Sequence, residues 1–524
     1  MVRVSEEADR RGIDTPEAVE LARSGQLWAP TRRHLMKSAG LAAAGLALTP
    51  TRAFAAPSAN TPRIAVVGAG LAGLACVDTL RSKGVAATLF EASDRAGGRC
   101  WTLGGAFGGP VDFPGQVAER GGEFIDTTHG TMRRWATEFG LDLEVVEPDG
   151  ETLFHFGGVT YDEAAVVGEY RLLVDALRDD LRTIGSPTAS SFTESDRLLD
   201  RTDLAGYLRD RGAGGLIGAV LEAAYRGEFG LELSEQSALS LLLFIHADRR
   251  SKFRPFGVFS DERFHVVGGN EQIVAGLVAR NAPSLRLGHR LAAVAETSGG
   301  KVRLTFETGR RMTEETFDRV VLAVPFSVLR GVDLSGFALP EWKQRAIGEL
   351  RYGTNSKHLV GFAGRPWQAP PVGGNGSIYA DLARLQNTWE TNQSLGDASR
   401  GVLTSFTGGV RGRAIDPRRV DAETAVFLAD LDRIVPGASS AVRQIRGRYV
   451  AHIENWSRSP YQLGSYTANH PGYFTTICDL EAPPVRALHF AGEHTSSFYE
   501  WQGFMEGGAL SGIRAAAEVY AAVR

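Results

Sequence analysis

A glycine-rich motif near the start of the chain constrains the fold more than any other feature. The β-branched run at residues 63–67 predicts a buried strand, and it leads directly into G-x-G-x-x-G at residues 68–73. A helical pattern follows over residues 74–83, with Gly84 as its C-terminal cap, and a second predicted strand ends in Glu91. Strand, glycine turn, helix, strand and acid within about 30 residues are typical of a dinucleotide-binding βαβ unit.

Each glycine of this motif has its own predicted task. Gly68 allows the tight turn, Gly70 lets the backbone approach a pyrophosphate, and Gly73 lets the helix pack on the strand. The helix N-terminus offers free N–H groups to the phosphates, and Glu91 accepts hydrogen bonds from ribose hydroxyls. Glycine is also over-represented, with 62 among 524 residues, about 12% against a typical value of about 7%. We expect part of this excess to lie where backbone approaches a ligand.

A second glycine pair favours a flavin over a nicotinamide dinucleotide. Residues 92–99 read Ala-Ser-Asp-Arg-Ala-Gly-Gly-Arg, which places the backbone of Gly98 and the guanidinium of Arg99 near the same pyrophosphate. Residues 119–125 then give a further glycine pair that ends at Gly122.

With these motifs, the sequence resembles the flavin-containing amine oxidases of the monoamine and polyamine oxidase type. The resemblance covers about 460 residues, from Arg63 to the C-terminus. It is densest at residues 67–99, 318–326, 357–367 and 455–508. It implies an α/β fold in which a Rossmann-like FAD-binding lobe is interleaved with an α+β substrate-binding lobe. The FAD-binding lobe is expected at residues 62–140, 263–336 and 447–524, and the substrate-binding lobe at residues 141–262 and 337–446.

The resemblance also implies which residues contact FAD outside the first motif. Glu493, after Gly492, holds the ribityl chain, and the helix that begins near Met505 faces the pyrimidine edge of the flavin. Leu291 matches the place where backbone meets adenine. The implied contacts are Gly98, Arg99, Gly122, Glu123, Leu291, Trp456, Gly492, Glu493 and Met505.

Three residues are implied to form the catalytic site. Tyr466 and Phe504 are the two walls of an aromatic slot in front of the flavin, where an amine is held. Lys357, ten residues before Trp367, bonds a water next to flavin N5 and helps reduced flavin react with O₂. Monoamine oxidases carry a flavin-linked cysteine where this chain has Ser465, so we expect noncovalent FAD.

The class of substrate is less constrained. Phe124 is expected to line the cavity, and Asp126 matches an acid that polyamine oxidases use for a second ammonium group. An equal alternative is that Asp126 caps the helix that starts near Gly130. Arg120 is a candidate partner for a substrate carboxylate, which keeps open an L-amino-acid oxidase.

The resemblance implies an oxidase of primary or secondary mono-, di- or polyamines. A hydride equivalent passes from the amine α-carbon to flavin N5, the imine hydrolyses to a carbonyl product, and O₂ is reduced to H₂O₂. The alternative is an L-amino-acid oxidase that yields a 2-oxo acid, ammonia and H₂O₂. A dehydrogenase or desaturase of non-amine substrates fits the sequence less well, because it leaves Lys357 and the aromatic pair unexplained. A non-catalytic flavin-binding or redox-sensing protein fits least well.

The first 55 residues predict an export signal. Arg32 and Arg33 precede the uncharged run at residues 38–51, and residues 53–55 form a small-x-small cleavage site. The pair of arginines resembles a twin-arginine signal, so we expect that export machinery to carry the chain to the periplasm or the exterior, with cleavage near Ala55. The apolar run is too short to span a bilayer.

Composition excludes several other classes. A net charge of −4 gives no reason to expect nucleic acid as a partner. Three scattered cysteines exclude a disulfide framework, and no metal site is predicted. The expected partners are a small amine and O₂; the oligomeric state is left open, with a homodimer as one option.

Overall fold

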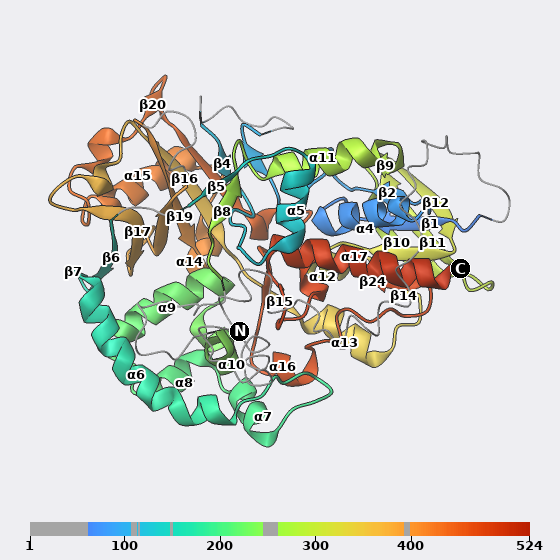
Figure 1. The fold of residues 1–524 in the computed structure, drawn as a ribbon, viewed down its shortest axis with the longest axis horizontal. Helices are drawn as coiled ribbons and strands as arrows, with labels where there is room; N and C mark the ends of the chain where they lie inside the picture. The colour runs from blue at the N-terminus through green and yellow to red at the C-terminus, as the bar shows by residue number, and fades with distance from the viewer. Residues whose placement is uncertain (1–60, 106–112, 114–115, 147–149, 245–259, 392–398) are drawn as a thin grey trace, which may run out of the picture.

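The structure is a computed structural model that describes residues 61–524 except 106–112, 114–115, 147–149, 245–259 and 392–398. The predicted export signal therefore lies outside the described residues. Within the described part, no helix combines the length and the apolar character needed to cross a membrane. The two largest sheets of the described residues have five and seven strands, and helices pack around them (Figure 1). A four-stranded sheet and four two-stranded sheets accompany them.

The first sheet is parallel and is assembled from three distant parts of the chain. Its strands, in spatial order, are β24 (Leu488–Phe490), β13 (Arg319–Leu322), β1 (Ile64–Val67), β2 (Thr88–Phe90) and β9 (Leu285–Arg286). Taken in chain order, the strands run outward in both directions from β1, which is the Rossmann arrangement. The order reverses between β1 and β13, and ligands of such sheets bind at that point.

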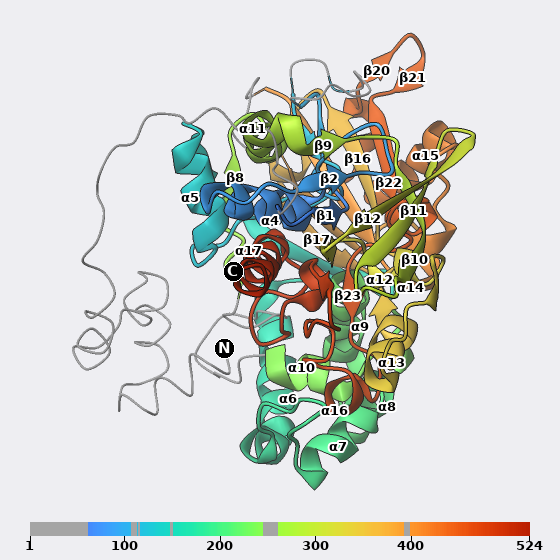
Figure 2. The ribbon, with the colours of Figure 1, turned by 90° about the vertical axis from the view of Figure 1, so that its right-hand side faces the viewer.

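Both faces of the parallel sheet are covered, which explains why β1 is apolar throughout. Ile64 and Val66 pack into one cluster with the helices α4 (Leu71–Ser82), α11 (Glu271–Asn281) and α17 (Met505–Ala522). Ala65 and Val67 belong to the other cluster, with β10 (Arg290–Glu296), β11 (Val302–Thr308) and β12 (Arg311–Phe317). Figure 2 shows β1 and β2 between these layers.

The second sheet has seven strands of mixed direction. In spatial order they are β22 (Ala451–Asn455), β16 (Ser356–Phe362), β19 (Gly401–Thr407), β18 (Asn387–Glu390), β17 (Gly374–Ala380), β6 (Glu151–Phe156) and β7 (Val159–Tyr161). Helix α15 (Val420–Leu431) packs on one face of this sheet. Residues 447–524 thus supply a strand to each sheet, β22 to this one and β24 to the parallel one.

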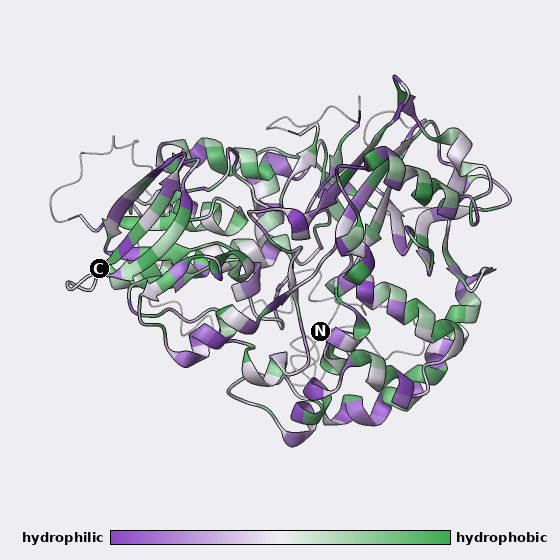
Figure 3. Cartoon of the chain, turned by 180° about the vertical axis from the view of Figure 1, so that it is seen from behind, coloured by the Kyte–Doolittle hydropathy of each residue, from purple (hydrophilic) through white to green (hydrophobic). Residues whose placement is uncertain are grey.

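Helices complete the second lobe. They are α6 (Glu163–Thr183), α7 (Glu194–Arg201), α8 (Leu204–Asp210) and α9 (Gly215–Phe229). They carry both hydrophilic and hydrophobic residues (Figure 3), and their apolar residues join the larger core. The end of α9 reaches the cavity described below.

Helix α4 begins earlier than the sequence predicts. Its first residue is Leu71 rather than Leu74, because Leu74 already donates its N–H to the carbonyl of Gly70. Gly70 has no side chain to cap the helix, so the first-turn N–H groups stay available to a ligand. Gly84 follows the helix with φ +74°, the left-handed conformation expected of a terminating glycine.

Candidate active site

A cavity of about 770 Å³ lies where the carboxyl ends of the parallel strands meet the seven-stranded sheet. Its size is ordinary for a cofactor or small-molecule site. Apart from Gly73, Arg120 and Asp126, every predicted site residue lines it. These residues are Gly68, Gly70, Glu91, Gly98, Arg99, Gly122, Glu123, Phe124, Leu291, Lys357, Trp456, Tyr466, Gly492, Glu493, Phe504 and Met505.

The first glycine motif forms a bare cradle at one end of the cavity. Gly68 has φ +104°, and a Cβ there would lie 2.6 Å from the carbonyl oxygen of Ala323, just after β13. A Cβ on Gly73 would overlap the carbonyl oxygen of Gly68. A Cβ on Gly70 would meet no atom within 4 Å, yet Gly70 lines the cavity. Packing within the protein therefore requires glycine at positions 68 and 73. At position 70 the protein leaves room for a side chain, so glycine is needed there only if a bound ligand occupies that space.

Glu91 is hydrogen-bonded to the backbone of this cradle and to Ser93. Its Oε2 accepts the N–H of Ala69 at 2.8 Å, and its Oε1 accepts the N–H and the hydroxyl of Ser93 at 2.9 and 2.8 Å. Glu91 thus stands beside the N-terminus of α4 at the end of β2, the position of a ribose-binding acid.

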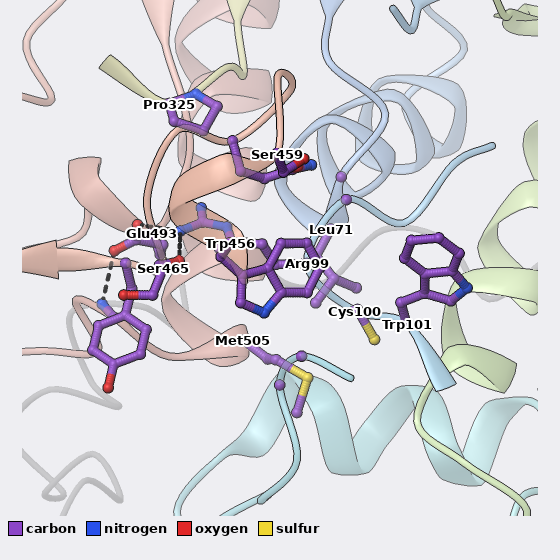
Figure 4. Close-up of a pocket in the computed structure, with 18 of the residues that line it drawn as sticks. Leu71, Arg99, Cys100, Trp101, Pro325, Trp456, Ser459, Ser465, Glu493 and Met505 are labelled. Carbon is purple, nitrogen blue, oxygen red and sulfur yellow. Dashed lines mark hydrogen bonds and ion pairs between the residues drawn. The ribbon is translucent and has the colours of Figure 1, made fainter. Parts of the chain in front are cut away.

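Arg99 and Glu493 form a clamp in the middle of the cavity (Figure 4). The Arg99 Nη1 donates to Glu493 Oε1 at 2.9 Å and to the carbonyl of Ser465 at 2.6 Å. The other carboxylate oxygen of Glu493 accepts the Thr467 hydroxyl at 2.8 Å and the Gly503 N–H at 3.0 Å. This clamp connects Arg99, which follows Gly97 and Gly98, to residues 465–467 and to residues 493–503.

Met505 and Trp456 fill the space beside this clamp. Met505 is the first residue of α17, and its side chain would collide with a Cβ on Gly122. The Trp456 Nε1 donates to the carbonyl of Arg120 at 3.2 Å, and its ring would crowd a Cβ on Gly121. Gly121 and Gly122 thus pack closely against the side chains of Trp456 and Met505. Bare backbone and a free helix N-terminus beside a cavity of this size fit a dinucleotide such as FAD.

Lys357 reaches the cavity from β16. The alternate residues of this strand, His358 and Val360, face α15, so Lys357 points to the opposite side. Its Nζ donates to the carbonyls of Glu119 and Gly121 at 3.1 and 2.8 Å and to Glu123 Oε2 at 2.6 Å. These three acceptors match the three N–H groups of an ammonium.

Glu123 is thus an ion-pair partner of Lys357. Its second oxygen, Oε1, accepts the Trp389 Nε1–H at 3.0 Å. The side chains of Lys357 and Glu123 are 6% and 3% exposed, so the pair is screened from bulk water. The sequence predicted Glu123 as a cofactor contact, and it missed both this pair and Trp389 because the three residues lie on separate strands and loops.

Tyr466 and Phe504 both line the cavity. The Tyr466 hydroxyl donates to the carbonyl of Glu228, at the end of α9. The Phe504 ring packs edge to face on His129 and Trp501, with ring centroids 5.4 and 5.8 Å apart. His129 is buried, and burial lowers its imidazole pKa to about 3, so it is a neutral support for the aromatic wall.

Asp126 takes neither of its two predicted roles. It does not line the cavity, and the N-cap of α5 (Gly130–Glu138) is His129, with no side-chain capping bond. The Asp126 Oδ1 instead accepts the hydroxyl of Ser260 and the N–H of Glu262, both at 3.0 Å. The segment that precedes β8 (Phe264–Val266) supplies both of these donors. No local sequence pattern around Asp126 predicts this contact.

Arg120 is bonded to other protein groups rather than exposed to a substrate carboxylate. Its Nε donates to Glu454 Oε2 at 2.8 Å, and its guanidinium lies 3.1 Å above the Trp101 ring. It does not line the cavity. Among the described lining residues, the Lys and Arg side chains are those of Arg95, Arg99, Arg290 and Lys357.

These four cations already have partners. Arg95 bonds the Gly98 and Cys100 carbonyls and pairs with Glu271, and Arg290 pairs with Glu307. Arg99 and Lys357 pair with Glu493 and Glu123.

Three acids that the sequence did not single out line the substrate side of the cavity. They are Glu228, Asp261 and Glu262. Burial raises the pKa of Glu228 to about 7 and that of Glu262 to about 8, and repulsion by Glu228 adds to the shift at Glu262. Asp261 is bonded through both oxygens to Thr127, by its N–H at 2.9 Å and its hydroxyl at 2.6 Å. Glu228 and Glu262 are far apart in sequence, so only the folded chain brings them together.

Comparison with known proteins matches residues 71–520 to the family described as flavin containing amine oxidoreductase. A putative L-amino-acid oxidase of Bacillus subtilis is 25% identical over 88% of this chain and 95% of its own length. A putative flavin-containing monoamine oxidase of Mycobacterium tuberculosis is 27% identical over 88% and 97%. The structure of cyclohexylamine oxidase from Brevibacterium oxydans superposes with a TM-score of 0.73 at 20% identity, covering 88% of this chain and 99% of that one.

Proposed function

The chain belongs to the flavin-containing amine oxidoreductases, and we propose that it oxidises amines in preference to α-amino acids. The family implies FAD and a donor with a C–H bond beside an amine nitrogen, whether an amine or an amino acid. The observation that carries the proposal is the acidic lining of the substrate side, where Glu228, Asp261 and Glu262 line the cavity. Arg120, the candidate carboxylate partner, is instead bound to Glu454.

The acidic lining is expected to strengthen binding of a substrate with an extra ammonium group and to weaken binding of a substrate with a carboxylate. Two unlike charges a few ångströms apart in a poorly hydrated cavity attract by a few kcal/mol, and two like charges repel by as much. The described cavity wall offers a carboxylate no guanidinium without a protein partner. We therefore expect mono-, di- and polyamines as substrates, with di- and polyamines favoured.

The chain's own residues then bind and orient the amine. Tyr466 and Phe504 flank the reacting amine, and His129 supports the Phe504 ring from behind. The glycine cradle, Arg99 and Glu493 would hold FAD, which would supply the acceptor for the hydride equivalent and the two electrons that, with two protons, convert O₂ to H₂O₂. Lys357 places a positive charge on the cavity wall, where it stabilises negative charge that develops on O₂. No described side chain is needed as a base if the amine enters unprotonated.

FAD is held without a covalent link in this proposal. Ser465 stands where monoamine oxidases attach the flavin, and a hydroxyl forms no stable bond there. The Ser465 Oγ donates to Asn355 Oδ1 at 2.5 Å, so it is also occupied within the protein. Acid or heat denaturation is expected to release all of the flavin into the supernatant, whereas flavin retained on the precipitated chain would contradict noncovalent binding.

An anaerobic bleaching screen tests the proposed function. The purified holoprotein is mixed without oxygen with monoamines, diamines, polyamines and L-amino acids, and loss of the flavin absorbance is followed. Amines, and above all diamines, are expected to bleach it, and air is expected to restore the colour with release of H₂O₂. Bleaching by L-amino acids but not by amines would replace the proposal with an L-amino-acid oxidase.

We further propose that residues 1–55 direct twin-arginine export. Because that route carries folded proteins, FAD would be bound before transport. Arg32→Lys combined with Arg33→Lys is expected to leave the uncleaved protein inside the cell, as judged by fractionation and N-terminal sequencing. Unchanged export of the double variant would overturn this proposal.

A further inference from the structure

The Lys357 ammonium has no N–H left over in this structure. Two of its donors are used by backbone carbonyls and the third by the Glu123 carboxylate, at 2.6 Å. Of the three acceptors, only the carboxylate carries a charge. The pair is almost fully buried and lies on the cavity wall.

We propose that Glu123 is a positioning residue that keeps Lys357 protonated and fixes its ammonium on the cavity wall. The inference rests on the proposed role of Lys357 in the reaction with O₂. In that reaction two electrons and two protons reach O₂, which becomes H₂O₂. A positive charge nearby favours the first electron transfer, because that transfer places negative charge on O₂.

The physical reason is the cost of a buried ammonium. Burial alone favours the neutral amine, and buried lysines without a partner can lose their proton near neutral pH. A carboxylate in contact reverses this preference, because opposite charges within about 4 Å favour the charged form. Without Glu123, Lys357 would keep only the two carbonyls of Glu119 and Gly121 as acceptors.

Other acids near Lys357 cannot replace Glu123. The Glu119 carboxylate is turned away, bonded to Thr102 and to the Asn270 N–H, and burial raises its pKa to about 7. Glu454, the register neighbour of Lys357 on β22, pairs with Arg120 and His452.

The remaining acids of the cavity wall near this site are Glu228, Asp261 and Glu262. Burial raises the pKa of Glu262 to about 8, although the Lys357 charge acts in the opposite direction. None of these three carboxylates is hydrogen-bonded to Lys357, and both oxygens of Asp261 are bonded to Thr127. Among the described residues, the carboxylate in contact with the ammonium is that of Glu123.

Trp389 fixes Glu123 in turn and provides a matched control. Its Nε1 donates to the Glu123 oxygen that does not touch Lys357, and its ring lies 5.5 Å from the Lys357 Nζ. Trp389→Phe removes that donor and leaves the ion pair. Glu123→Asp shortens the carboxylate but keeps its charge. Both variants disturb packing at this site without removing the charge that the proposal needs.

The test is the rate constant for reoxidation of the reduced flavin by O₂, measured by stopped flow from about pH 6 to about pH 10. For the native protein this rate constant is expected to be flat. Glu123→Gln is expected to stay within about threefold of it at low pH and to fall at least about tenfold as pH rises, because Lys357 now loses its proton. Trp389→Phe and Glu123→Asp are expected to stay flat.

A second readout does not depend on turnover. At low pH, Glu123→Gln leaves the Lys357 charge uncompensated, so the midpoint potential of bound FAD is expected to exceed that of the native protein. At high pH, where Lys357 is neutral, the two potentials are expected to converge. Glu123→Ala answers the same question if the Gln variant does not fold. Either a flat reoxidation profile for Glu123→Gln or a potential equal to that of the native protein at every pH would overturn the proposal.

Lys357→Met separates this inference from the proposed function. If Lys357 assists the reaction with O₂, this variant reoxidises slowly at every pH while flavin reduction by amine is little changed. Native reoxidation by Lys357→Met would overturn the role of Lys357 itself. Slow reoxidation by Lys357→Met together with a flat profile for Glu123→Gln would overturn the role of Glu123 alone.

Discussion

The two ends of the cavity treat their carboxylates in opposite ways. At the cofactor end, Glu91 and Glu493 each accept three hydrogen bonds through their two oxygens, from backbone N–H groups, hydroxyls and Arg99. At the substrate end, burial raises the pKa values of Glu228 and Glu262 to about 7 and about 8, and repulsion by Asp126 at Glu228 and by Glu228 at Glu262 adds to the shifts. At the cofactor end, the protein itself supplies the hydrogen-bond donors for the carboxylates. At the substrate end, a cationic ligand would supply the positive charge that Glu228 and Glu262 lack.

The largest expected effect tests the cofactor end. Gly73→Ala forces a Cβ onto the Gly68 carbonyl, so α4 must move away from β1. We expect a loss of about 3 kcal/mol in the free energy of unfolding, the upper range for overpacking, together with loss of FAD. Chemical denaturation and the flavin content of the purified protein measure both.

Gly70→Ala is the matched control at the same motif. Gly70 has φ −72°, which alanine adopts freely, and its Cβ would meet no protein atom. The apoprotein is expected to unfold like the native chain, while FAD affinity falls by about 100-fold, because the methyl group occupies the space of the ligand. Equal FAD affinity in this variant would show that the cradle does not approach the cofactor.

The next effect tests the substrate end. Glu228→Gln and Glu262→Gln each remove a carboxylate from the cavity, and we expect the KM for diamines to rise about tenfold, equivalent to about 1.4 kcal/mol. FAD content and flavin reoxidation should not change. Glu222→Gln, on the exposed side of the same helix as Glu228, is the control. A KM that responds equally to all three substitutions would mean that the cavity acids do not contact substrate.

The same acids predict a pH dependence. As pH rises through about 7 and about 8, Glu228 and Glu262 lose their protons and gain negative charge. Attraction for the distal ammonium of a diamine therefore increases, so its KM should fall over this interval. The KM of a monoamine should fall less, because a monoamine has no distal ammonium. Parallel profiles for the two substrates would contradict this interpretation.

The smallest effect concerns Asp126, which stands behind the aromatic wall. Burial raises its pKa to about 8, against about 3.9 in an unfolded chain. Between these values the folded state holds a proton that the unfolded state releases, so stability falls as pH rises from about 4 to about 8. Asp126→Asn keeps an oxygen for Ser260 and Glu262, and it should raise Tm by about 2 °C at pH 8 and leave it unchanged near pH 4. Calorimetry at both pH values is the check.

The same contrast explains what the sequence could predict. The parallel sheet and its glycine cradle follow from one continuous stretch, where strand, turn and helix signals lie side by side. Lys357 and Glu123 are 234 residues apart, and Glu228 and Glu262 come from separate segments, so no local pattern pairs them. Asp126 was misjudged for the same reason, since the partner that captures it, Ser260, lies 134 residues away.

The central claim is that the substrate end selects amines over amino acids. The most direct measurement compares 1,5-diaminopentane with L-lysine, which differ only by the α-carboxylate, as anaerobic reductants of the bound flavin at the same concentration and pH. The acids of the cavity and the commitment of Arg120 to Glu454 predict at least about 100-fold faster reduction by the diamine, or about 2.7 kcal/mol. Faster reduction by L-lysine would contradict the account.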